Sequence, residues 1–128
     1  MADTEKITIN ISVVDLGRID LLVEQGFYST RTDFIRTATR NLLGTHSQEI
    51  QETVSRRTIV VGVLIFEAKD LRKHRQRNEM VDIRAMGLLV LANDITPQLA
   101  RETIASINVY GVFRASKEVK EALADRMK

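Results

Sequence analysis

A short alternating segment near the start of the chain limits what it can fold into more than any other feature. Residues 6–12 read Lys-Ile-Thr-Ile-Asn-Ile-Ser, with isoleucine at every second position. In a β-strand successive side chains point to opposite faces, so this segment predicts one branched apolar face and one polar face. A lone strand leaves its backbone unpaired and its apolar face uncovered. We therefore expect a partner strand, and a second copy of the chain is the most economical source.

Two amphipathic helices are predicted directly after this strand. Ser12 has the spacing of a helix cap, apolar residues then recur at helical spacing, and Gly26 is a natural stop, which predicts a helix over residues 13–25. A second apolar stripe lies between a cap at Thr30 and a stop at Gly44. The free N–H groups at a helix start favour an anion such as a phosphate. At the second helix these groups are joined by two hydroxyls and a guanidinium, from Thr30, Arg31 and Thr32.

The order of these features resembles the ribbon-helix-helix family of prokaryotic DNA-binding regulators. That family shows a glycine, a short gap, Ser/Thr-Arg-Ser/Thr-Glu/Asp, an apolar pair, an arginine and a small residue. The corresponding positions here are Gly26, Thr30, Arg31, Thr32, Asp33, Phe34, Ile35, Arg36 and Ala38. The resemblance covers roughly the first third of the chain.

The resemblance implies a homodimer in which two copies of residues 6–12 pair as an antiparallel ribbon. The isoleucines at positions 7, 9 and 11 would pack onto the interlocked helices, and the ribbon would enter the major groove of DNA. Base contacts are then expected from Lys6, Thr8 and Asn10, and phosphate contacts from Thr30, Arg31 and Thr32. The alternatives are the solvated face of an ordinary edge strand and a plain surface arginine.

The second half of the chain contains a repeat. Three apolar segments, at 58–66, 83–91 and 107–113, each have a central glycine, and the three glycines are almost evenly spaced. Each segment is followed by a predicted helix, roughly at 68–78, 97–106 and 116–127. We expect three strand–helix units with a parallel sheet, arranged like a solenoid, with an ordinary three-stranded α/β fold as the rival. The glycines serve packing or turns, or else let a ligand approach the backbone.

These patterns together predict an α+β protein. It would have a ribbon-helix-helix DNA-binding domain at 1–45, a helix extension or linker at 46–57, and a repeat domain at 58–128 for oligomerisation or effector sensing. The net charge is only +2, so any contact with nucleic acid must come from a local patch. One basic run supplies possible auxiliary DNA contacts, with a solvated helix face or a site for an acidic protein as alternatives: Arg72, Lys73, Arg75 and Arg77.

Composition argues against other classes of protein. There is no cysteine, no apolar run of membrane-spanning length and no signal peptide, so we expect a cytoplasmic protein. Phosphate-binding loops and zinc-protease motifs are missing, so we expect neither an enzyme nor a metal or cofactor. The sequence thus predicts a sequence-specific transcriptional regulator, a repressor in the first instance, with double-stranded DNA and a second copy as partners. An antitoxin and a DNA-coating or partition protein are the alternatives, and the operator, effector and oligomer size stay open.

Overall fold

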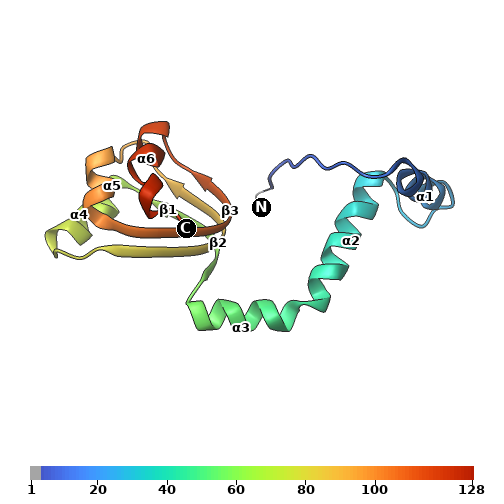
Figure 1. The fold of residues 1–128 in the computed structure, drawn as a ribbon, viewed down its shortest axis with the longest axis horizontal. Helices are drawn as coiled ribbons and strands as arrows, with labels where there is room; N and C mark the ends of the chain where they lie inside the picture. The colour runs from blue at the N-terminus through green and yellow to red at the C-terminus, as the bar shows by residue number, and fades with distance from the viewer. Residues whose placement is uncertain (1–3) are drawn as a thin grey trace. The chain divides into compact units, whose positions relative to one another are not determined.

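The computed structural model describes residues 4–128, which divide into two compact units, residues 4–53 and residues 54–128. The first unit contains helices α1 (Val13–Glu24) and α2 (Arg31–Thr45). A third helix, α3 (Ser47–Arg57), leads into the second unit (Figure 1). The two helices predicted for the first half of the chain are confirmed, with ends that differ by about one residue.

Both helices of the first unit begin where their capping residues place them. The Ser12 hydroxyl accepts a hydrogen bond from the backbone N–H of Asp15 at 3.2 Å. The Thr30 hydroxyl accepts one from the N–H of Asp33 at 3.0 Å. Gly26 follows α1 with φ of +86°, a left-handed conformation that glycine adopts without strain. Local capping therefore sets both ends of α1 and the start of α2.

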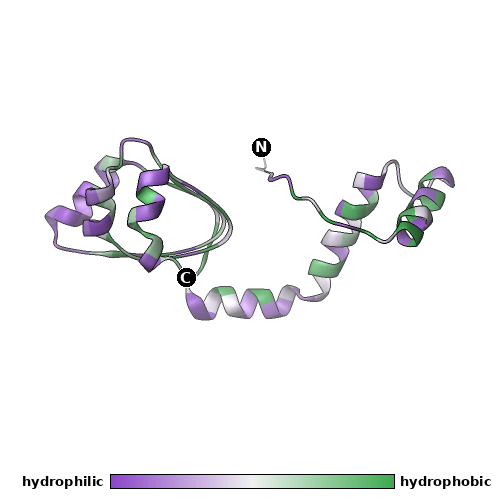
Figure 2. Cartoon of the chain, turned by 45° about the horizontal axis from the view of Figure 1, so that its top comes forward, coloured by the Kyte–Doolittle hydropathy of each residue, from purple (hydrophilic) through white to green (hydrophobic). Residues whose placement is uncertain are grey.

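The helices of the first unit leave much of their apolar surface uncovered within one chain. Ile19 is the buried residue of α1, and α2 has no buried residue. Leu21, Leu42 and Leu43 are 52%, 66% and 54% exposed, and Figure 2 shows hydrophobic segments along both helices. Exposed leucines on this scale need another surface against which to pack.

The second unit is a parallel three-stranded sheet with helices between its strands. Strand β2 pairs with β1 on one side and with β3 on the other, and the glycines at 62, 87 and 111 lie in register across the sheet. The predicted parallel sheet is therefore confirmed, and aligned glycines in consecutive strands are what stacked repeats produce. The elements are β1 (Val60–Phe66), α4 (Ala68–Gln76), β2 (Val81–Leu91), α5 (Pro97–Thr103), β3 (Ile104–Arg114), α6 (Lys117–Ala122) and a 3₁₀ turn (Ala124–Arg126).

The aligned glycines mark the place where the three strands bend. Gly62, Gly87 and Gly111 have φ of +129°, +133° and +125°, and the strands curve together through an arc with the helices on its open side (Figure 2). A methyl group on Gly87 would overlap the carbonyl oxygen of Gly62, and one on Gly111 would overlap that of Gly87. Backbone conformation and close packing of the strands explain these glycines.

The three predicted helices in this half are all shorter than expected, and the last two differ most. Residues 104–106 were expected to end a helix, but they begin β3, because Ile104 is fully buried and pairs with Val81 of β2. The final helix was expected to reach residue 127 but ends at Ala122 and gives way to the 3₁₀ turn. Burial in the sheet overrides the local helix preference at Ile104.

The core of the second unit lies between the sheet and its helices. The largest fully buried apolar side chains come from both layers: Leu71, Leu89, Leu91, Ile104, Ile107, Val119 and Leu123. The edge of β3 is partly covered, since Met127 forms an isolated bridge with Ile107 and the N–H of Lys128 donates to the Ile107 carbonyl. No described strand pairs with the other edge of β1.

Candidate nucleic-acid interface

The segment predicted as the DNA-reading strand forms no regular secondary structure in the single chain. Residues 4–11 belong to no helix or strand, and Lys6, Thr8 and Asn10 are exposed. Ile7 and Ile9 are 77% and 56% exposed, so they do not pack on the helices of their own chain. The backbone N–H and C=O groups of a strand need hydrogen-bond partners on a neighbouring strand. Among the described residues of one copy, no strand pairs with this segment.

The start of α2 is held by a compact set of hydrogen bonds. The Asp33 carboxylate accepts from the backbone N–H of Ser29 at 3.0 Å and from the Ser29 hydroxyl at 3.2 Å. The Ser29 N–H in particular lowers the pKa of Asp33 below its ordinary value. Because Thr30 also caps this helix, the turn before it is fixed before any ligand arrives.

Arg31 and Thr32, at the first positions of α2, are exposed, but Arg31 has a partner within the chain. Its guanidinium donates from Nε and from Nη2 to the two carboxylate oxygens of Asp20 in α1, each at 2.8 Å. This bidentate arrangement holds the pKa of Asp20 below its ordinary value. Thr30, Arg31 and Thr32 thus lie together at one exposed helix start, where Arg31 retains N–H groups on Nη1 for a further acceptor.

The basic run of the second unit lies on and just beyond α4. Arg72, Lys73, Arg75 and Arg77 are exposed. Arg75 lies 3.9 Å from a carboxylate oxygen of Glu102, whereas the other three form no ion pair with any described residue. They form an exposed cationic surface, whose side chains can be hydrated or can contact phosphate groups.

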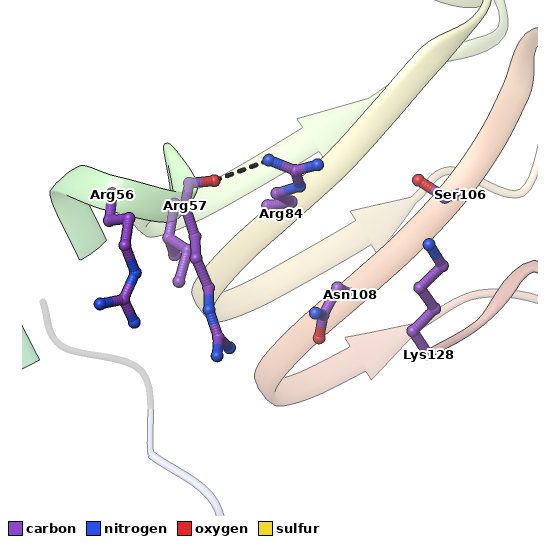
Figure 3. A pocket seen from close by; sticks show the side chains of 7 residues that line it. Arg56, Arg57, Arg84, Ser106, Asn108 and Lys128 are labelled. Atoms are coloured by element: carbon purple, nitrogen blue, oxygen red, sulfur yellow. Dashed lines mark hydrogen bonds between the residues drawn. The ribbon is translucent and has the colours of Figure 1, made fainter. Parts of the chain in front are cut away.

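A second cationic cluster was missed by reasoning from the sequence. Four cations, Arg56, Arg57, Arg84 and Lys128, line one pocket at the beginning of the sheet (Figure 3). The adjacent arginines at 56 and 57 were the available signal. The approach of Arg84 and Lys128 depends on strand register, which the sequence pattern alone does not supply.

Comparison with known proteins decides the family. The sequence model of the ribbon-helix-helix transcriptional regulator family matches residues 2–120. The chain belongs to this family. The match extends beyond the ribbon and its two helices through most of the repeat unit, so the repeat unit is part of what the family model describes. No curated protein and no solved structure matches the chain.

Membership of the ribbon-helix-helix regulators confirms the resemblance found in the first third of the chain. These regulators bind DNA and usually dimerise, and they are generally not enzymes. Within residues 4–128, no group of three His, Cys, Asp or Glu side chains is placed to hold a metal ion. No helix of the described chain is long and apolar enough to cross a lipid bilayer.

Proposed function

We propose that this ribbon-helix-helix protein is a sequence-specific repressor that reads DNA as a homodimer. The ribbon would form from residues 6–12 of two copies, with Lys6, Thr8 and Asn10 against base edges in the major groove. The observation that carries the proposal is the exposure of residues 6–10 of this alternating segment. Its polar and its apolar side chains are both free in one copy, as Ile7 and Ile9 show.

The helices supply the second support for a homodimer. The exposed leucines of α1 and α2 and the exposed isoleucines at 7 and 9 belong to the same compact unit. Pairing two ribbons and interlocking two sets of helices would cover both at once. A unit of this size gains too little from its own core, so dimerisation and folding of residues 1–45 should be linked.

The exposed start of α2 would contact the DNA backbone beside the ribbon. Thr30, Arg31 and Thr32 offer two side-chain hydroxyls, a guanidinium and helix N–H groups to a phosphate. A dimer bound to an operator that overlaps a promoter would block RNA polymerase without any further contact, so repression is the simplest outcome of such binding. The auxiliary contacts at Arg72, Lys73, Arg75 and Arg77 would add a salt-dependent component that is blind to sequence.

Alanine substitutions separate base reading from phosphate contact. Asn10→Ala should remove roughly 1–3 kcal/mol of discrimination between operator and random duplex. Arg31→Ala should weaken both DNAs alike and reduce the salt slope of binding by about one unit. Fluorescence anisotropy with the two duplexes measures both. Equal weakening of operator and random duplex by Asn10→Ala would contradict the base-reading role.

The repeat unit would assemble these dimers through the open edge of β1. Val61, Val63 and Ile65 on this strand are 64%, 51% and 61% exposed, and no described strand pairs beyond it. Two β1 strands related by a two-fold axis would pair antiparallel, satisfy the open backbone edge and place these side chains beside apolar neighbours on the partner strand. A second dimer is the favoured partner because it presents an identical open edge of β1, and identical edges pair about a two-fold axis.

Sedimentation of the full-length protein tests this assembly. Val61→Lys should reduce the size of the complex, because a charge on an edge strand opposes pairing. Met80→Lys is the matched control: Met80 is 50% exposed in the same unit but lies outside the strands. A wild-type protein that stays a dimer at every concentration, or an equal effect of both substitutions, would refute assembly through β1.

A further inference from the structure

We propose that the second unit binds a small phosphate-bearing molecule in the cationic pocket where its strands begin. The pocket has a volume of about 320 Å³, which lies in the size range of small-molecule sites. Figure 3 shows side chains from the end of α3, from β2 and from β3 around one space. Its lining residues are Arg56, Arg57, Ile59, Arg84, Ser106, Asn108 and Lys128.

The charge of this pocket is unbalanced. Four of its seven lining side chains are cationic and none is acidic. None of the four forms an ion pair with another residue of the described chain, although ion pairs occur elsewhere in it, such as those of Arg31 and Arg101. The one carboxylate found bonded to a lining residue is Asp82, which accepts a hydrogen bond from the Ser106 hydroxyl at 2.6 Å. Like charges that line one pocket repel one another, and an anion in the pocket would relieve that repulsion.

Several of these groups are held in place before a ligand binds. Arg84 donates from Nη1 to the backbone carbonyl of Arg57 at 2.9 Å (Figure 3). Arg57 donates from its own Nη1 to the hydroxyl of Tyr110 at 2.9 Å. The backbone N–H of Lys128 donates to the Ile107 carbonyl at 2.9 Å, which fixes the end of the chain beside β3. Groups that are already oriented lose less entropy when they bind, so the pocket is prepared for its ligand.

The chemistry of the pocket favours phosphate over other anions. Guanidinium groups match phosphate oxygens in bidentate geometry, and a phosphate group brings about two negative charges to a site with four cations. Ser106 and Asn108 add neutral polar groups for the rest of the molecule. A DNA backbone carries the same phosphate chemistry, but a concave pocket of this size suits a small molecule better than a duplex.

The position of the pocket also suggests what its ligand does, and this step rests on the proposed DNA-binding function. Arg56 and Arg57 end α3, the helix that continues from the first unit. Thr58 follows with φ of +53°, a left-handed conformation that is unfavourable for a β-branched residue. An anion bound to both arginines would stabilise this strained turn, so the ligand would act as the effector of the regulator.

Calorimetric titration of the full-length protein with inorganic pyrophosphate, at constant ionic strength, tests the site. We expect saturable binding that Lys128→Gln weakens by about tenfold, the loss of one charge-assisted hydrogen bond. The Lys128 side chain has no hydrogen bond among those found in the structure, so this substitution should leave the fold unchanged. Arg84→Gln should weaken binding as well. Arg72→Gln, which removes an exposed cation of α4 outside the pocket, is the matched control and should change affinity less than about twofold.

The outcomes distinguish a small phosphate-bearing molecule from a DNA backbone, and they separate the pocket proposal from the proposal of base reading by the ribbon. Absence of saturable binding, or an equal loss in Arg72→Gln and Lys128→Gln, would overturn the site. A random duplex that competes with pyrophosphate, together with an equal loss of duplex affinity in Lys128→Gln, would make the pocket a DNA backbone contact and overturn the small-molecule proposal. Asn10→Ala should bind pyrophosphate like wild type, so failure of base reading would leave the pocket result intact.

Discussion

Arg31 at the start of α2 forms two hydrogen bonds with Asp20 of α1, both at 2.8 Å. The family resemblance implies that this arginine contacts a DNA phosphate, whereas in the structure it contacts a carboxylate. Phosphate and carboxylate are therefore competing acceptors for one guanidinium. The ion pair holds Arg31 in a defined position but reduces the positive charge that DNA would meet.

Removing the competing carboxylate should strengthen binding to DNA in general. Asp20→Asn should raise affinity for random duplex and make the salt slope steeper by a fraction of a unit, because Arg31 is then no longer shared between the Asp20 carboxylate and a phosphate. Anisotropy across a salt series measures the slope. Asp15→Asn is a matched control, since it removes the same charge from the Asp15–Arg18 pair of the same helix. A gain that persists in the Asp20→Asn, Arg31→Ala double variant would not come from Arg31.

Acid should weaken the folded protein through its paired aspartates. Hydrogen bonds hold the pKa values of Asp20, Asp33 and Asp125 below their ordinary range, chiefly from Arg31, the Ser29 N–H and Arg101 respectively. A lowered pKa in the folded state adds stability above the unfolded value of about 3.9, and this stability is lost as pH falls through the lowered pKa. Thermal unfolding between about pH 2 and 7 should show wild type more stable than Asp20→Asn at neutral pH. A difference that does not shrink in acid would contradict the assignment.

Thr58 is an unusual residue for its backbone conformation, and we expect a substitution there to increase the stability of the fold. It follows α3 with φ of +53°, while its N–H donates to Ser55 and the next N–H donates to Val54, the pattern of a Schellman cap. Glycine is the usual residue there, so Thr58→Gly should stabilise the protein by about 1 kcal/mol. Denaturant unfolding measures the change.

Asn78 supplies the matched control for this cap. It also has φ of +53° after α4, with equivalent hydrogen bonds to Arg75 and His74. Asparagine tolerates the left-handed region, so Asn78→Gly should gain less than Thr58→Gly. Equal gains at both positions would show that the β-branched side chain of Thr58 is not the source of strain.

The glycine row should be sensitive to a single methyl group in a position-dependent way. Gly62 and Gly87 have nearly the same φ, but a methyl group on Gly62 meets open space while one on Gly87 overlaps the Gly62 carbonyl. Gly62→Ala should cost about 1–3 kcal/mol from backbone strain alone. Gly87→Ala should cost a further 1–3 kcal/mol or so from overpacking. Similar losses in both variants, measured by denaturant unfolding, would show that the strands move apart easily.

Local signals explain why much of the fold was predictable. The caps at Ser12 and Thr30 and the stop at Gly26 act within a few residues, and the structure places the helix ends where these residues predict. The repeat spacing of the glycines predicted the parallel sheet, and the structure shows equivalent residues of the equal units side by side.

Non-local contacts explain what the sequence did not reveal. Ile104 looks like part of a helix until the sheet that buries it is known. Arg57, Arg84 and Lys128 are far apart in the chain, and only the register of β2 and β3 and the return of the C-terminal residues to Ile107 bring them to one pocket. The ion pair of Arg31 with Asp20 depends in the same way on how α1 and α2 pack.

Binding to the DNA upstream of the protein's own gene tests the central proposal most directly. Wild type is compared with the Lys6→Ala, Thr8→Ala, Asn10→Ala triple variant by fluorescence anisotropy, across a salt series with random duplex as competitor. We expect wild type to bind the upstream DNA tightly and to resist the competitor, and we expect the triple variant to lose this binding. The residual, salt-dependent affinity of the triple variant for the upstream DNA should match its affinity for random duplex. Equal affinity of wild type for the upstream DNA and for random duplex would contradict sequence reading by the ribbon and favour a protein that coats DNA.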